Sequence, residues 1–364
     1  MNTLAARLAE RIARSGPITV ADYMAAALND PDHGYYRTAD PLGAGGDFTT
    51  APEISQLFGE LVGAWLIDCW EQAGRPGRVN LVELGPGRGT LMADILRVGR
   101  HVPDWLKAVQ LHLVEINPRL RQAQAEILSA YTPQWHAALS TAPDGPMMLV
   151  ANEFLDALPI RQLIFWNGAW RERLVGWSAE TGFEFVVSAG PSPLSLLLPA
   201  DLPATQGDVY ELSPAVIAAG TEIARRIARD GGAALIVDYG RTESAAVETL
   251  QAVRAHRMVK VLDDPGAADL SAHVDFALLA RVARETGAIA AGPATQGAFL
   301  DELGIGLRAE RIRRGLTADA AATLDQAVAR LTDPKAMGQL FKVLAIVSPG
   351  ITPAGLPPPG LALC

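Results

Sequence analysis

The chain has very little cysteine and no long apolar run. Its 364 residues include two cysteines, Cys69 and Cys364, which have neither the spacing of a metal site nor the number for a disulfide framework. This favours a reducing compartment and predicts no bound metal. No uninterrupted apolar segment reaches the ~18 residues of a membrane-spanning helix, so we expect no membrane insertion.

Positive charge is also scarce. Lysine and arginine number 31 against 40 aspartate and glutamate, which gives a net charge of −9. Such an acidic chain is a poor partner for bulk nucleic acid or an anionic membrane surface, and it favours a basic substrate. With 49% hydrophobic and 20% charged residues, the chain can bury a sizeable core in one large decorated domain or two smaller ones.

What the chain does have is an acidic strand end followed by alternating glycines. The apolar run Val79–Leu84 contains Glu83, glycines follow at 85, 87 and 89, and a helix is predicted over Thr90–Val98. Glycines in such a turn let backbone N–H groups approach a ligand closely. A dinucleotide-binding loop reads G-x-G-x-x-G and receives a pyrophosphate. Here the spacing is G-x-G-x-G, and the preceding carboxylate would repel a pyrophosphate but suits the sulfonium and ammonium groups of S-adenosylmethionine.

The pattern E-x-G-x-G-x-G resembles motif I of the class I methyltransferases. It predicts these cofactor-binding residues: Glu83, Gly85, Pro86, Gly87, Gly89 and Thr90. The alternative is that the glycines serve only the close packing of a helix against a strand.

A second acidic strand end follows. The run Leu111–Ile116 contains Glu115, and Asn117 and Pro118 then begin a helix. An acidic residue at the end of the second strand of a nucleotide-binding α/β fold binds the ribose hydroxyls, so Glu115 and Asn117 are predicted cofactor contacts. The alternative is a solvated carboxylate at a strand end.

Strands and helices alternate along the chain, which predicts an α/β fold with a mostly parallel sheet and right-handed crossovers. The predicted strands are Asn80–Glu83, Leu111–Ile116, Gln134–His136, Met147–Ala151, Ala233–Tyr239, Ala288–Ala291 and Leu340–Val347. The predicted helices include Met1–Arg14, Glu53–Glu71, Pro214–Arg229 and Asp275–Thr286.

The predicted domain organisation has three parts. Residues 1–45 form a helical lead-in whose first segment resembles a transit peptide, but Glu10 and the folded-looking segment Pro17–Leu28 favour a capping helix. Residues 46–347 form the main domain, with an antiparallel β-insertion at about 161–205, signalled by Asn167-Gly168, and a helical insertion at about 300–332. Residues 348–364, rich in proline and glycine, are expected to be disordered.

Seven further segments, taken with the glycine loop, resemble the MidA-like family. They are Gly46–Glu60, Ala151–Pro159, Tyr210–Pro214, Val237–Gly240, His273–Phe276, Thr295–Gly297 and Met337–Lys342, and the resemblance covers about residues 17 to 347. The stretch Thr249–Arg254 departs from the family pattern.

This family comprises S-adenosylmethionine-dependent methyltransferases related to a mitochondrial complex I assembly factor that methylates arginine. The resemblance implies a class I (Rossmann-like) methyltransferase sheet with one antiparallel strand at its end. It also implies S-adenosylmethionine as cofactor and, as substrate, an arginine in a protein such as a respiratory complex I subunit. The expected location is the cytoplasm of a bacterium or the mitochondrial matrix of a eukaryote.

An acceptor arginine needs carboxylates that hold its guanidinium and orient one nitrogen toward the methyl group. Glu153, Asn152 and Asp156 follow the predicted strand Met147–Ala151, at the edge where α/β sheets bind ligands. Glu153 is the first candidate for holding the acceptor, Asn152 for orienting it, and Asp156 is the second candidate. The alternative is that Asn152 and Asp156 cap a helix or turn after the strand.

Other polar residues are secondary candidates. Thr50 and Glu53, in the segment Asp47–Glu60, are predicted to contact cofactor or substrate; alternatively, Thr50 or Ser55 caps the following helix. Glu211 and Asp238, at strand ends expected to face one edge, would add negative potential, and Asp275 is expected to be an N-cap.

Two other functions fit the cofactor loop: an assembly chaperone that binds cofactor without turnover, and a small-molecule methyltransferase. An NAD-dependent dehydrogenase is disfavoured by the loop spacing and by Glu83.

Overall fold

The protein forms two compact units, each assembled from three stretches of chain. The computed structural model describes residues 3–38, 49–199 and 202–357. One unit contains Met1–Phe48, Asp156–Ala218 and Glu243–His273, and the other contains Thr49–Leu155, Ala219–Thr242 and Val274–Cys364. The start of the segment Asp47–Glu60 lies outside the described residues.

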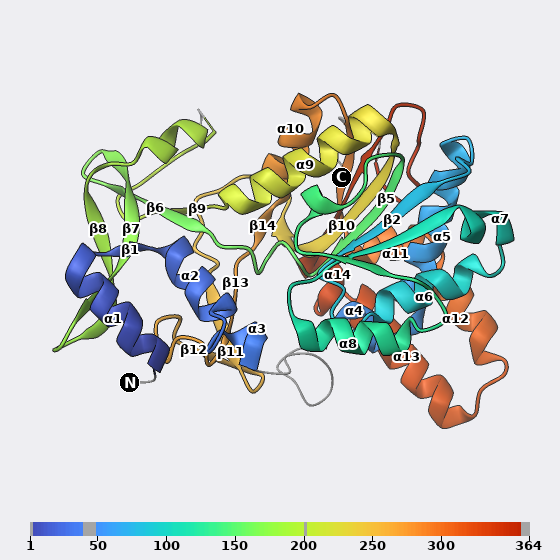
Figure 1. The fold of residues 1–364 in the computed structure, drawn as a ribbon, viewed down its shortest axis with the longest axis horizontal. Helices are drawn as coiled ribbons and strands as arrows, with labels where there is room; N and C mark the ends of the chain where they lie inside the picture. Colours follow the sequence, from blue (N-terminus) through green and yellow to red (C-terminus); the bar gives the residue numbers. More distant parts are fainter. Residues whose placement is uncertain (1–2, 39–48, 200–201, 358–364) are drawn as a thin grey trace. The chain divides into compact units, whose positions relative to one another are not determined.

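The larger unit is built on an eight-stranded sheet in the order β15-β16-β10-β5-β2-β3-β4, with β14 paired to β10 (Figure 1). From β10 to β4 all neighbours are parallel, while β16 is antiparallel to both β10 and β15. The strands are β2 (Val79–Leu84), β3 (Val109–Val114), β4 (Gln134–His136), β5 (Met147–Asn152), β10 (Gly232–Arg241), β14 (Val274–Asp275), β15 (Ile289–Thr295) and β16 (Phe341–Val347). The predicted α/β fold is confirmed, and the antiparallel strand expected at the end of the sheet is β16, with β15 outside it.

Helices pack against this sheet because its central strands are apolar on both faces. Every residue of β2, β5 and β16 is buried. The helices are α4 (Ala51–Ile54), α5 (Gln56–Gln72), α6 (Thr90–Gly99), α7 (Pro103–Ala108), α8 (Pro118–Ile127), η1 (Leu139–Thr141), α9 (Pro214–Asp230, beginning in the other unit), α10 (Phe276–Glu285), α11 (Gln296–Glu302), α12 (Ile305–Arg313), α13 (Ala318–Thr332) and α14 (Met337–Leu340). Within the described ranges, no helix is both long and apolar enough to cross a membrane.

The helix predicted at Glu53–Glu71 is two helices. Ser55 has an extended backbone and separates α4 from α5, and its hydroxyl oxygen accepts a hydrogen bond from the Leu57 N–H at 3.2 Å. Ser55 is therefore the N-cap of α5, as the alternative interpretation expected. Thr50 precedes α4 at the N-cap position but makes no side-chain capping bond.

The smaller unit contains antiparallel sheets and the N-terminal helices. One sheet has the order β1-β7-β6-β9, with β8 paired to β7, and the other has the order β12-β11-β13. Its elements are α1 (Thr3–Ser15), β1 (Ile18–Thr19), α2 (Val20–Asn29), α3 (Tyr35–Thr38), β6 (Arg161–Trp166), β7 (Ala169–Ser178), β8 (Gly182–Pro191), η2 (Pro193–Leu197), β9 (Val209–Leu212), β11 (Gln251–Arg254), β12 (Arg257–Val259) and β13 (Asp269–Ser271). The predicted hairpin is present between β6 and β7, where Asn167 and Gly168 both have positive φ.

The helical lead-in does not stand apart from the insertion. Leu4, Leu8 and Ile12 on one face of α1 share an apolar core with Val175 of β7 and Leu270 of β13. An amphipathic helix must bury its apolar stripe, and here the β-insertion and the segment after Leu250 supply the partner. The observed division therefore differs from the predicted one at 1–45 and 46–347.

Part of the expected disordered tail is ordered. Ile351 is 5% exposed, the Ala354 carbonyl accepts a hydrogen bond from Trp65 Nε1 at 3.1 Å, and the Thr352 N–H donates to Gln72 Oε1 at 2.8 Å. The prediction of disorder is thus wrong for residues 348–357, because these residues pack and bond against α5. The remainder, 358–364, lies outside the described residues.

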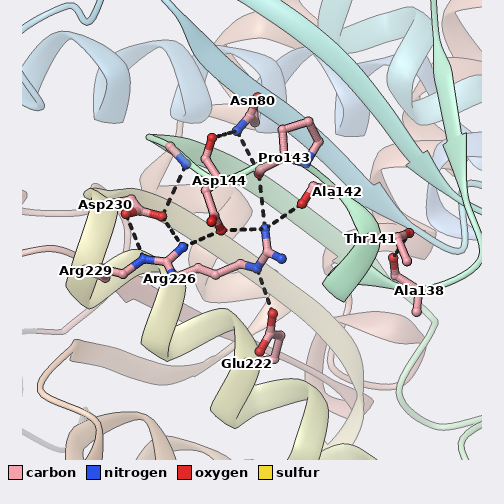
Figure 2. Close-up of polar contacts among 11 residues, drawn as sticks. Asn80, Ala138, Thr141, Ala142, Pro143, Asp144, Glu222, Arg226, Arg229 and Asp230 are labelled. Atoms are coloured by element: carbon pink, nitrogen blue, oxygen red, sulfur yellow. Dashed lines mark hydrogen bonds and ion pairs between the residues drawn. The ribbon is translucent and has the colours of Figure 1, made fainter.

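A polar network joins Arg226 and Asn80 to the carbonyls of the loop before β5 (Figure 2). Arg226 of α9 is 7% exposed and donates to the carbonyls of Ala142 and Pro143 at 3.1 and 3.2 Å, and to Glu222 at 2.7 Å. Asn80 of β2 donates to the Pro143 carbonyl at 3.1 Å. The network therefore connects α9 and β2 to the loop that enters β5.

Replacing Arg226 by methionine should lower the free energy of unfolding by about 2 kcal/mol, because the buried carbonyl oxygen of Ala142 and the partly buried one of Pro143 would lose a charged donor. Urea unfolding followed by circular dichroism measures the change. Arg225→Met is the matched control, since Arg225 is exposed on the same helix and should change stability by less than about 0.5 kcal/mol. Equal curves for the two variants would contradict the prediction.

Candidate functional site

The glycine loop forms the turn between β2 and α6. Gly85 has φ of 61°, and a Cβ there would lie 2.6 Å from Cδ2 of the Phe154 ring. Gly89, with φ of 88°, is the N-cap of α6, and its N–H donates to the Pro86 carbonyl at 2.7 Å. Thr90 is the first residue of α6. The loop therefore needs glycine for both its conformation and its packing, and it presents the N-terminus of a helix.

Glu83 is a buried carboxyl group without a full set of partners. It is 3% exposed, and its Oε2 atom has no hydrogen-bond partner among the described residues. Burial raises the pKa of Glu83 to about 8, since the surroundings disfavour the charged form. A cation placed against this group would favour its ionised form, which is the property that the cofactor prediction requires.

Glu115 directly follows β3 and is 8% exposed. Its Oε1 atom accepts a hydrogen bond from the Asn117 N–H at 2.7 Å, and burial raises its pKa above the ordinary value. The alternative of a solvated carboxylate is therefore wrong. Asn117 itself is the N-cap of α8, because its side-chain oxygen accepts from the Arg119 N–H at 2.9 Å.

Sequence reasoning did not predict a role for Gln124 of α8. This side chain connects the glycine loop after β2 to Glu115 after β3. It is fully buried, and its Nε2 atom donates to the Gly87 carbonyl at 2.7 Å and lies 3.5 Å from Glu115 Oε2. Its Oε1 atom accepts from Trp135 Nε1 at 2.8 Å. The available signal was a polar residue four positions before the apolar Leu128, on the inward face of a helix.

Asn152 and Glu153 lie at the carboxyl end of β5. Glu153 Oε1 accepts hydrogen bonds from the Ala51 N–H at 3.0 Å and from Asn152 Nδ2 at 3.1 Å. Asn152 Oδ1 is buried without a partner in the described part of the chain. Glu153 has φ of 51°, a conformation that costs about 1–3 kcal/mol for a residue with a side chain and persists only where its surroundings impose it.

Two effects raise the pKa of Glu153 to about 7. Burial is the larger, and the negative charge of Glu53 on α4 adds to it. Glu53 lies on α4 and Thr50 directly precedes it, and the first N–H of this short helix, that of Ala51, donates to Glu153. No helix directly follows β5 in the described chain, so Asn152 and Asp156 do not cap one; Asp156 lies in a turn after the strand.

Asp156, the second candidate for holding the acceptor, follows three residues after Glu153 in the chain. Asp156 belongs to the smaller unit, is 8% exposed, and its carbonyl oxygen accepts a hydrogen bond from the Ala272 N–H at 3.0 Å. Burial raises the pKa of Tyr36 in that unit, and the charges of Asp269 and Asp156 add to the effect.

Glu211 and Asp238 belong to different sheets, so the expectation that they face one edge is wrong. Glu211 lies in β9 of the smaller unit and accepts hydrogen bonds from Gln162 Nε2 and the Leu250 N–H, both at 2.9 Å. Asp238 lies in β10 of the larger unit. The N-cap prediction for Asp275 is confirmed, since its Oδ1 atom accepts from the Leu278 N–H at 2.9 Å.

The residues of this edge fit S-adenosylmethionine. Glu83 pairs with Val150 across β2 and β5, and Asn152 lies two residues after Val150, so both side chains point to one face of the sheet. The unpartnered atoms there, Glu83 Oε2 and Asn152 Oδ1, are acceptors that call for a cation or a donor. Among the described residues, no group of three or more His, Cys, Asp or Glu could hold a metal ion.

Comparisons with known proteins identify the family. The family described as "Putative S-adenosyl-L-methionine-dependent methyltransferase" matches residues 61–294. The chain is 38% identical over 367 residues to "Protein arginine methyltransferase NDUFAF7, mitochondrial" of Danio rerio, covering 94% of this chain and 86% of that protein. The Homo sapiens protein of that name is 36% identical over 365 residues, covering 93% and 81%.

A solved structure agrees with this assignment. The crystal structure of a Burkholderia thailandensis protein bound to S-adenosyl-homocysteine matches with a TM-score of 0.83 and 29% identity, covering 96% of this chain and 92% of that one. The predicted cofactor and the predicted Rossmann-like fold are thereby confirmed. The chain belongs to the family of S-adenosylmethionine-dependent methyltransferases.

Proposed function

We propose that this methyltransferase acts on an arginine side chain of a protein substrate. The observation that carries the proposal is the buried Glu153 at the carboxyl end of β5. Burial and the charge of Glu53 raise its pKa to about 7, and it accepts a hydrogen bond from the Ala51 N–H. Paired carboxylates at such a position suit a guanidinium, which carries a positive charge and several N–H donors. The names of relatives that are 36–38% identical, protein arginine methyltransferases, support the same acceptor.

The residues that would hold the cofactor are those of the glycine loop and the two acidic strand ends. Glu83 would face its cationic part and Glu115 its ribose, with Thr50, Glu53 and Asn117 as further candidates. When bound, the cofactor supplies a methyl group already activated on a sulfonium. The protein's own contribution is to align the acceptor and exclude water.

Glu153 would bind the acceptor and take its proton. Methylation of a guanidinium nitrogen releases one proton, and a carboxyl group with a pKa of about 7 is suited to accept it near neutral pH. Asn152 would orient the guanidinium through its unpartnered Oδ1 atom. Asp156 stays a predicted second contact.

Partner and location follow from the resemblance. A respiratory complex I subunit is the acceptor that the family implies. Relatives are named as mitochondrial proteins, which supports the mitochondrial matrix in a eukaryote. The cytoplasm of a bacterium stays a prediction.

Glu153→Gln should reduce methyl transfer by roughly 100-fold or more, because glutamine cannot accept a proton or carry the charge that binds a guanidinium. The assay uses radiolabelled S-adenosylmethionine and a lysate that lacks the native protein, followed by sequencing of the labelled band. Cofactor affinity by isothermal titration should stay within about threefold of wild type.

Glu285→Gln is the control for this experiment, since Glu285 is exposed on α10. Label on a residue other than arginine would overturn the proposed acceptor. Cofactor binding without label on any lysate protein would favour an assembly chaperone, and label on small molecules alone would favour a small-molecule methyltransferase.

Cofactor binding should become tighter as pH rises from 6 to 8. In the free protein Glu83, with a pKa of about 8, is mostly protonated below pH 8, and a bound cation favours its carboxylate, so binding releases a proton. Linkage then strengthens affinity by up to about tenfold per pH unit until the pKa is passed.

Isothermal titration in buffers of different ionisation enthalpy counts the released protons. Glu83→Gln should bind the cofactor more weakly and release fewer protons. The ligand's own amino group titrates equally with both proteins, so the difference isolates Glu83. Identical pH profiles for wild type and variant would show that Glu83 does not face the cation.

A further inference from the structure

Asp238 is a fully buried carboxylate in β10, the strand next to β5. Its Oδ2 atom accepts hydrogen bonds from the Phe154 N–H at 3.1 Å and from the Leu155 N–H at 2.8 Å. Its Oδ1 atom accepts from the Tyr239 N–H at 2.8 Å. Two of these three donors belong to the turn that directly follows Glu153.

The backbone of Glu153 is therefore held on both sides. Its own N–H donates to the Val237 carbonyl at 2.9 Å, which continues the pairing of β5 with β10 by one residue. The next two N–H groups, of Phe154 and Leu155, are bound by Asp238. Glu153 has φ of 51° between these attachments, so the strand pairing and the carboxylate together impose a conformation that the residue would rarely adopt.

This conformation decides where two side chains lie. It brings Glu153 Oε1 within 3.0 Å of the Ala51 N–H and 3.1 Å of Asn152 Nδ2. It also brings the Phe154 ring against Gly85 in the cofactor loop. A carboxylate suits the task because one oxygen can accept from two amides at once, and charge strengthens both bonds. An asparagine at this position would place its own NH₂ group, a donor, against at least one of these three backbone N–H groups.

We propose that Asp238 is a positioning residue for methyl transfer, whose carboxylate holds the turn after β5 so that Glu153 faces the acceptor. Asp238 acts through Glu153 and does not itself touch the substrate. The inference depends on the proposed function only for the role of Glu153; the holding of the turn can be tested separately.

The first test follows the turn in the protein alone. In Asp238→Asn, hydrogen exchange at the Phe154 and Leu155 amides should accelerate at least tenfold. The pKa of the Glu153 carboxyl should fall below about 7, because the side chain becomes less buried. Amide exchange by NMR and infrared difference titration against Glu153→Gln measure the two effects. Unchanged amide protection and an unchanged Glu153 titration would overturn the inference, whatever the acceptor is.

The second test is a double-mutant cycle on the initial rate of methyl transfer, measured at saturating S-adenosylmethionine with the same lysate. Asp238→Asn should lower the rate roughly 10- to 100-fold with cofactor affinity within about threefold of wild type. In the Glu153→Gln background the same substitution should cost less than about threefold, because the residue through which it acts is gone. Independent, multiplying losses would overturn the inference.

Asp275→Asn is the matched control. Asp275 is also a buried aspartate that accepts a backbone N–H, but it caps α10. The Asp275→Asn variant should be less stable than wild type, and its rate of methyl transfer should stay within about threefold of wild type. This result separates a positioning role from a general loss of stability. If Asp238→Asn does not fold, Asp238→Glu, which keeps the charge and moves the carboxylate by one methylene, is measured by the same criteria.

The two proposals fail in different ways. A fully active Glu153→Gln would remove Glu153 from the proposed function, and the exchange and titration measurements would still decide whether Asp238 holds the turn. A Glu153→Gln variant that loses transfer, beside an Asp238→Asn variant that keeps it, would retain the proposed function and overturn the positioning role.

Discussion

Parallel pairing of β2 with β3 on one side and with β5 on the other is the constraint on which the site depends. Parallel strands end at the same edge of a sheet, so segments separated by many residues in the chain meet there. The loop after β2 bears the glycines, the turn after β3 bears Glu115, and the turn after β5 bears Glu153. At the opposite edge, Arg226 and Asn80 hold the loop that enters β5.

Buried carboxyl groups are the second feature of this edge. Glu83, Glu115 and Glu153 all have pKa values raised chiefly by burial. A protein concerned only with stability would pair such groups or replace them by apolar ones. Glu83, whose Oε2 atom has no hydrogen-bond partner among the described residues, is instead prepared for a cationic ligand, and the family membership identifies the cofactor that brings the charge.

Sequence reasoning succeeded where chemistry is encoded locally. The spacing of Gly85, Gly87 and Gly89 after an acidic strand predicted the cofactor, because all three positions have positive φ, a backbone conformation that favours glycine. It did less well where a side chain is given its role by distant segments. Gln124 of α8, which donates a hydrogen bond to the Gly87 carbonyl in the glycine loop, was missed for this reason. Asp238 was taken as a source of negative potential, whereas its partners are the backbone donors of another strand's turn.

The sequence by itself determined the α/β alternation, the glycine turn, the hairpin at Asn167-Gly168 and the N-cap at Asp275, because each depends on a few neighbouring residues. Only the tertiary structure decided which polar groups are buried, which carboxylate accepts from which backbone, and that Asp156 belongs to a different compact unit from Glu153. The physical reason is that hydrogen-bond partners and burial are set by segments far apart in the chain, whose meeting depends on the strand order of the folded sheet.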